Sequence, residues 1–267
     1  MDLQFIKIQK ELERRREILI RLSNDDSFIM SSVDRGLIKS LLERWEVPDR
    51  PSDIPTFMKQ FCVSVFSYAP LRKYLTNLIG DIPMRDTIAR ALSLAFNENE
   101  FVPNSNWFPE TLGELAAKIQ VVNKYNLASK QFRPRIIAVL LSGTAKMAKE
   151  LVNGLDNFYK MIPKVTEPSD MWELVNDFSR PIKQVGPTLI CDFFKEIGFT
   201  RYVKIDHHFK KQFPGILPPG WDCNKNTKHS FILSQEIADK IGMTPFHLDF
   251  ILYLWGRYGS KSRIGVV

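Results

Sequence analysis

The chain has 267 residues, of which 44% are hydrophobic and 25% charged, a balance typical of a globular protein with one large or two small domains. This composition excludes a disordered chain, a collagen-like fibre and a disulfide scaffold. The net charge is +7, and seven basic residues stand against three acidic ones between Lys195 and Lys228. That surplus fits a polyanionic partner such as nucleic acid, and equally well an exposed surface of mixed charge.

Targeting and cofactor signals are absent from the sequence. The longest apolar runs, at 136–141 and 250–255, fall short of the roughly 20 residues that cross a bilayer, so no membrane partner is expected. The first residues have neither a basic nor an apolar leader segment. Cys62, Cys191 and Cys223 lie far apart and form no C-x-x-C pair, so we expect no metal, iron–sulfur cluster or other cofactor. We expect an intracellular protein, cytoplasmic in a prokaryote or nuclear in a eukaryote.

Helical periodicity recurs along nearly the whole chain, which predicts an all-α fold. The first expected helix is charged, and residues 11–17 provide i,i+4 ion pairs. The last begins with Thr244 as its N-cap and Pro245 at its first position, just after Gly242 as the C-cap of the preceding helix. Loops are expected at 46–53, 98–107, 163–169 and 214–229. Helices are expected at residues 5–22, 34–45, 55–66, 70–79, 84–96, 109–121, 132–141, 145–161, 169–178, 187–197, 206–213, 234–241 and 245–256.

A helix, a tight turn and a second helix are predicted over residues 172–197. The turn ends at Gly186, and Pro187 opens the second helix. A glycine in the turn lets another backbone approach closely, and N–H groups at the helix start can bind a DNA phosphate. By itself this pattern also fits simple helix packing. An acidic residue, Asp206, follows Thr188 by 18 residues and lies at the head of another expected helix.

These stretches resemble the helix–hairpin–helix DNA glycosylase superfamily, which includes adenine-mismatch, oxidised-pyrimidine and alkyladenine glycosylases. The family's hairpin, L-P-G-V-G-x-x-T-A, corresponds to IKQVGPTLI at residues 182–190. Its catalytic stretch, V-D-x-H-V-x-R, corresponds to IDHHFKK at residues 205–211, and its L-S-Q-Q-T segment, which borders the DNA, is similar to VLLSGT at residues 139–144. Three features depart from the family: Gln184 replaces the first hairpin glycine, the interval from Ser142 to the hairpin is short, and the iron–sulfur cysteines are missing.

The resemblance covers residues 132–258 and implies a glycosylase-like helical bundle over 132–267. Residues 1–131 are expected to form a helical N-terminal extension in which we see no family resemblance, and packing of the two parts into one bilobal unit is left open.

The resemblance implies that Asp206 is catalytic. A carboxylate stabilises the oxocarbenium-like sugar that forms when a glycosidic bond breaks, and it can orient the attacking water. An aspartate at a helix head is also a common N-cap. Members with lyase activity carry a lysine at the position of Thr188, which forms a Schiff base. Threonine therefore predicts a monofunctional enzyme, with Lys183 and Lys204 as the lysines that offer an alternative.

Further roles are also implied by the resemblance. His208 supports the structure, and a metal site formed by Asp206, His207 and His208 is a weaker alternative because adjacent residues diverge on a helix. Ser142 to Ala145 would form a poor wedge for the vacated base stack. Asp192 either reads a flipped base or is solvated, and solvation is favoured. The expected DNA contacts are Lys183, Gln184, Val185, Gly186, Thr188 and Lys211. The candidate base-pocket residues are Asp192, Trp107, Trp172 and Tyr253, although aromatic residues more often belong to the core.

The sequence thus predicts a monofunctional DNA glycosylase that acts on double-stranded DNA containing a damaged, mismatched or modified base. A bifunctional glycosylase with lyase activity and a non-catalytic helix–hairpin–helix DNA-binding protein are the first alternatives. A third is an unrelated helical interaction protein, which would show no salt-dependent DNA binding.

Overall fold

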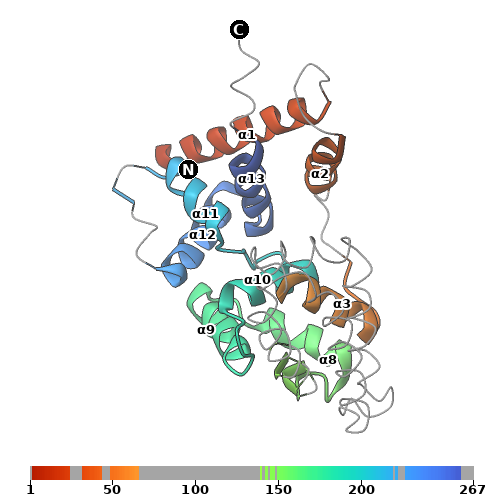
Figure 1. Cartoon of the computed structure of the whole chain (residues 1–267). Coiled ribbons are helices and arrows are strands. Elements are labelled where there is room, and N and C mark those ends of the chain that lie inside the picture. Colours follow the sequence, from red (N-terminus) through yellow and green to blue (C-terminus); the bar gives the residue numbers. More distant parts are fainter. Residues whose placement is uncertain are drawn as a thin grey trace, which may run out of the picture. The chain divides into compact units, whose positions relative to one another are not determined.

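The computed structural model describes residues 2–24, 32–43, 49–65, 139, 142–143, 145–147, 149–218, 220–221 and 226–259 (Figure 1). Within these residues the regular elements are helices and no strand occurs, which confirms the predicted all-α class. The α-helices are α1 (Leu3–Asn24), α2 (Ser32–Glu43), α3 (Ile54–Val65), α8 (Gly154–Met161), α9 (Pro168–Ser179), α10 (Pro187–Glu196), α11 (His207–Gln212), α12 (Thr227–Ile241) and α13 (Pro245–Tyr258). Two 3₁₀ turns, η1 (Ile162–Lys164) and η2 (Pro214–Ile216), accompany them.

Two expected boundaries are wrong. The helix expected at 145–161 is interrupted by a turn at 151–153, and α8 begins at Gly154, whose φ of +81° is left-handed. Helix α12 begins well before residue 234, inside the expected loop, because the Asn226 side chain accepts a hydrogen bond from the His229 N–H at 2.7 Å. This cap gives α12 its start. The helices expected at 70–79, 84–96 and 109–121 lie outside the described residues.

The chain divides into two compact units. The chain-end unit comprises Met1–Pro48 and Gly198–Val267, and the central unit comprises Asp49–Ile197. The N-terminal helices therefore share a unit with the C-terminal ones. The domain boundary expected between residues 131 and 132 lies outside the described residues.

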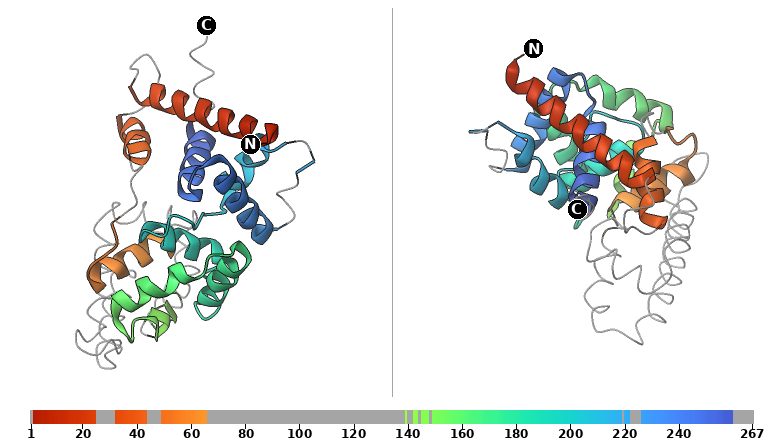
Figure 2. Two further views of the ribbon diagram at one scale, coloured as in Figure 1. Left: turned by 180° about the vertical axis from the view of Figure 1, so that it is seen from behind. Right: turned by 90° about the horizontal axis from the view of Figure 1, so that it is seen from above.

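Helix α1 is the longest described element of the chain-end unit and packs against α2, α12 and α13 (Figure 2). Its apolar face joins α2 and α13 in one core cluster of Leu19, Leu22, Ile38, Leu42, Leu254 and Tyr258. Burying each aliphatic side chain contributes roughly 1.5–3 kcal/mol. The Tyr258 hydroxyl donates to the Asp34 carboxylate at 2.8 Å, which gives this buried phenol a partner.

Aromatic side chains dominate the core of the central unit, where α10 packs against α3 and α9. The Phe193 ring lies 5.1 Å from the Phe57 ring and 5.4 Å from the Phe61 ring, with edge-to-face geometry in both pairs. A Cβ atom on Gly143 would lie 2.8 Å from the Phe61 ring. Residue 143 must therefore be small for the segment of Ser142 and Gly143 to pack against α3.

No helix in the described part of the chain combines the length and the apolar character needed to cross a lipid bilayer.

Candidate active site

The turn between α9 and α10 is an ordered hairpin in the central unit. The Ile182 N–H donates to the Ser179 carbonyl at 2.9 Å, and the Val185 N–H donates to the Ile182 carbonyl at 3.2 Å. The Ile182 and Val185 side chains are buried, with 2% and 7% exposed. The two apolar residues thus anchor the turn from inside, while Lys183 and Gln184 between them are exposed.

Gln184 has a left-handed backbone, with φ of +67°, and no other described non-glycine residue has a positive φ. A left-handed conformation costs an L-residue roughly 1–2 kcal/mol, and glycine adopts it freely. Gln184 occupies the position of the first glycine in the family's hairpin pattern. The backbone therefore has the conformation that a glycine favours, although the residue departs from the pattern.

Gly186, in contrast, has no conformational need to be glycine. Its φ of −95° and ψ of 170° are extended, and a Cβ atom added to it would meet nothing within 4 Å. It is the N-cap of α10 without a side-chain cap, and its carbonyl accepts from the N–H groups of Leu189 at 3.0 Å and Ile190 at 3.4 Å. The backbone at Gly186 is exposed and can be approached from outside.

The Ser142 segment is tied directly to this hairpin. The Ser142 hydroxyl accepts a hydrogen bond from the Lys183 N–H at 2.9 Å, across 41 positions of sequence. Two stretches that carry the family resemblance are thus joined within the central unit. Ser142 is engaged with the hairpin backbone, and the hairpin residue Thr188 is half-buried in the first turn of α10.

Asp206 is the N-cap of α11 in the chain-end unit. Its Oδ1 atom accepts from the Phe209 N–H at 3.0 Å, and its carbonyl accepts from the Lys210 N–H at 2.9 Å. The Asp206 N–H donates to the Lys204 carbonyl at 2.8 Å, which turns the chain sharply before the helix. The side chain is half-buried, and within the described residues Oδ2 makes no hydrogen bond. The carboxylate is held by one oxygen and leaves the other for an incoming group.

The helix that Asp206 caps is fixed to α13 through His208. The His208 ring lies edge-on to the Tyr253 ring at 5.3 Å, and the Tyr253 hydroxyl accepts from Arg257 at 2.9 Å. A Cβ atom on Gly256 would lie 3.2 Å from His208 Nδ1, so glycine permits this close packing. These contacts hold His208 between α11 and α13. Lys211 is exposed.

The metal alternative gains no support, because the described residues contain no group of three metal-ligating side chains.

The base-pocket candidates have different environments. The expectation that Asp192 is solvated is wrong: the side chain is buried and lies 3.3 Å from the Lys195 ammonium, which offsets the cost of burying the carboxylate. Trp172 is buried in the central unit, Tyr253 is half-buried in the chain-end unit, and Trp107 lies outside the described residues. The hairpin and Asp206 likewise belong to different units.

The burial of two charged residues, Lys195 and Arg15, was not anticipated from the sequence. Lys195 is buried with Asp192, and the i,i+3 spacing of the two residues is the signal that could have indicated the pair. On α1, Arg15 and Glu11 form an ion pair at the i,i+4 spacing expected for residues 11–17, and the burial of Arg15 was not anticipated.

No protein-family model, no curated protein and no solved structure matches this chain.

Proposed function

We propose that the chain is a monofunctional DNA glycosylase of the helix–hairpin–helix type. It excises a damaged, mismatched or modified base from double-stranded DNA by hydrolysis of the N-glycosidic bond. In this proposal the hairpin at residues 182–188 binds the DNA backbone and Asp206 acts on the sugar.

The observation that carries the proposal is the exposed Gly186 beside the left-handed Gln184. Glycine loses more conformational entropy on folding than any other residue. A positive φ or tight packing often explains its presence, and neither applies to Gly186. Glycine is also a common N-cap residue, and at this exposed N-cap it leaves the backbone open to the approach of another molecule. A phosphate is the ligand expected at the exposed start of a helix, where the helix dipole favours negative charge.

The chemistry follows from the environment of Asp206. Water adds to the sugar C1′ atom as the bond to the base breaks, and the base leaves with a proton, so the products are a free base and an abasic site. The Asp206 carboxylate stabilises the positive charge that develops on the sugar. Capping by Oδ1 fixes the side chain, and Oδ2 is left to face the sugar or the water. Thr188 has no amine, so the proposed enzyme forms no Schiff base at this position.

The decisive experiment compares base release by the wild type and Asp206→Asn on duplexes that carry different damaged, mismatched or modified bases. Asparagine keeps an oxygen that can cap α11 and removes only the charge. We expect the wild type to release one class of base and the variant to be slower by about 100-fold or more, the size of effect seen when an electrostatic stabiliser is removed. Equal release by both proteins would contradict the role of Asp206.

Two outcomes would select the alternatives. If neither protein releases a base from a broad panel while both bind DNA, the chain is a non-catalytic DNA-binding protein. If borohydride traps a covalent adduct between the wild type and DNA, the enzyme is bifunctional, since only a Schiff base is captured.

The DNA-binding part of the proposal is tested by Gly186→Ala. The added methyl group has room and an ordinary φ, so the free energy of unfolding should change by less than about 0.5 kcal/mol, while DNA affinity should fall about tenfold because the backbone is shielded. Gly36→Ala is the matched control, since Gly36 also has nothing within 4 Å of an added Cβ atom. Gly36 lies in α2, away from the hairpin in sequence. Equal DNA affinities of the two variants would contradict a contact at Gly186.

A further inference from the structure

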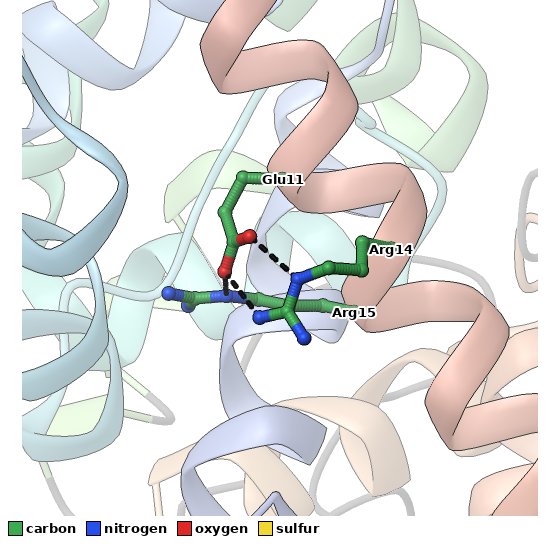
Figure 3. A network of polar contacts seen from close by, with 3 residues as sticks. All are labelled: Glu11, Arg14 and Arg15. Atoms are coloured by element: carbon green, nitrogen blue, oxygen red, sulfur yellow. Dashed lines mark hydrogen bonds and ion pairs between the residues drawn. The ribbon is translucent and has the colours of Figure 1, made fainter.

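Two arginines and a glutamate form a cluster on α1 in the chain-end unit (Figure 3). The Glu11 Oε2 atom accepts from Arg14 Nε at 2.7 Å, and Oε1 accepts from Arg14 Nη2 at 2.8 Å. Oε1 also accepts from Arg15 Nε at 2.8 Å. Both guanidinium groups lie against the ring of Trp255 on α13, with their Cζ atoms 5.3 Å and 5.2 Å from its centre. The Glu11 carboxylate thus accepts hydrogen bonds from both arginines.

The cluster carries more positive than negative charge. The hydrogen bond from Arg14 is the main cause that lowers the pKa of Glu11 to about 2, so the carboxylate is ionised at neutral pH. Two guanidinium charges against one carboxylate leave a net charge of about +1.

Arg15 is the buried arginine of the cluster, and within the described residues one of its nitrogen atoms has no hydrogen-bond acceptor. Its residue is only 5% exposed, and its Nη1 atom is buried without a hydrogen-bond partner in the described part of the chain. An unsatisfied buried donor on a charged group is unfavourable, and it marks a place where an acceptor is missing. Glu11 has only two oxygens, and both already accept from Arg14 or Arg15.

We propose that the Arg14–Arg15 cluster is a binding site for a phosphate dianion, with the Glu11 carboxylate as the internal anion that the phosphate displaces. A phosphate dianion balances both guanidinium charges and has more acceptor oxygens than a carboxylate. The planar guanidinium fork suits phosphate recognition, and both forks lie close to the ring of Trp255.

Access to the site is from the Glu11 and Arg14 side. Their side chains are 29% and 52% exposed, whereas that of Arg15 is 6% exposed. When Glu11 swings into solvent, the incoming phosphate meets Arg14 first and Arg15 behind it. The ligand is either free orthophosphate or a phosphomonoester such as a nucleoside monophosphate. This inference is independent of the proposed glycosylase activity.

The test measures binding of orthophosphate and of adenosine monophosphate to the full-length chain by calorimetry, at constant ionic strength and neutral pH. We expect saturable binding to the wild type. Glu11→Gln should bind phosphate about tenfold more tightly, because the competing charge is gone, and Arg14→Gln should bind about tenfold more weakly. Tighter binding of the nucleotide than of orthophosphate would identify a phosphomonoester as the ligand, and equal binding would identify free phosphate.

Glu13→Gln is the matched control. Glu13 lies on the same helix, is exposed and accepts a hydrogen bond from Gln9 at 3.0 Å. The Glu13→Gln substitution changes the net charge by the same amount as Glu11→Gln and should leave phosphate affinity unchanged. The proposal is overturned if the wild type shows no saturable binding, or if Glu13→Gln tightens binding as much as Glu11→Gln does. Arg14 is the more exposed arginine, so its variant is expected to fold, and an unchanged affinity in Arg14→Gln would also overturn the site.

Discussion

Three helices of each unit begin in different ways. In the chain-end unit α11, α12 and α13 start with a side chain that caps a backbone N–H, and these residues are Asp206, Asn226 and Thr244. In the central unit α8, α9 and α10 start without a side-chain cap, at Asn153, Glu167 and Gly186. Helix α3 of the same unit differs, because the Asp53 carboxylate accepts a hydrogen bond from the Thr56 N–H at 2.7 Å. An uncapped start is thus shared by α8, α9 and α10 and does not by itself mark a binding site.

One helix in each unit differs from its neighbours: α10 in the turn that precedes it, and α11 in the charge of its capping residue. Helix α10 is preceded by the left-handed Gln184 and the open Gly186, a combination that α8 and α9 lack. In the chain-end unit, Asn226 and Thr244 show that a neutral side chain is sufficient for capping. The charge of Asp206 exceeds what the cap requires, and this surplus is what the proposed chemistry uses.

The largest effect is expected from the hairpin. Gln184→Val should lower the free energy of unfolding by about 2 kcal/mol, because a β-branched residue tolerates a left-handed backbone poorly. Gln184→Gly should raise it by up to about 1 kcal/mol, because glycine relieves the strain. Urea denaturation measures both. Equal stabilities of the two variants would mean that the turn is not constrained, and the contrast between α10 and its neighbours would disappear.

The cap of α11 gives the next effect. Asp206→Ala should lower the free energy of unfolding by about 1 kcal/mol, because the Phe209 N–H loses its acceptor, whereas Asp206→Asn should change it little. Asn226→Ala on α12 should cost a similar amount and serves as the comparison from the same unit. Thermal or urea unfolding checks all three. If Asp206→Asn is as unstable as Asp206→Ala, its charge is needed for the fold and the separation of cap from catalysis fails.

A smaller contribution to the free energy of unfolding comes from the ionised Glu11 on α1, and acid should remove it. The Arg14 guanidinium holds the pKa of Glu11 at about 2, below its ordinary value of 4.5. A lowered folded-state pKa stabilises the fold above the ordinary value, and this stabilisation is lost as pH falls from 4.5 towards 2. Solvent screening limits the contribution to about 1 kcal/mol. The urea midpoint should therefore fall less steeply between pH 6 and pH 2 for Glu11→Gln than for the wild type. If the midpoints of the two proteins fall in parallel with pH, the ion pair between Glu11 and Arg14 does not stabilise the fold.

Local patterns in the sequence predicted much of the secondary structure. Thr244 caps α13 with Pro245 in its first turn, and Gly242 ends α12 with φ of +67°, as expected. These features depend on neighbours a few residues away, so the sequence contains them directly. The start of α12 was missed because the capping residue Asn226 lies in a stretch rich in proline and glycine, which favours a loop assignment.

Features that depend on distant contacts could not be predicted. Helix α1 packs on α13 although most of the sequence separates the two helices, and periodicity does not indicate which helices pack together. Asp192 was expected to be solvated, and no sequence signal indicated that Arg15 is buried, because charged residues are rarely buried. Each is buried with an oppositely charged neighbour one helical turn away, and the same spacing also occurs on exposed helix faces. For the candidate site, the sequence located the hairpin and the cap at Asp206, whereas the left-handed Gln184 and the open space around Gly186 required the structure.

The smallest expected effect is on the salt dependence of DNA binding, and it tests the hairpin most directly. Lys183 is exposed in the turn, and its backbone N–H is held by the Ser142 hydroxyl, so the side chain projects from a fixed position. If it neutralises one DNA phosphate, Lys183→Ala should reduce the slope of log affinity against log salt by about 1 and weaken binding to all duplexes alike. Lys164→Ala is the control, because Lys164 is an exposed lysine of the same unit that lies in η1, outside the hairpin. A general effect of net charge would change the slope equally in both variants. A change confined to Lys183→Ala would assign the contact to the hairpin and would distinguish α10 from the other uncapped helices of the central unit.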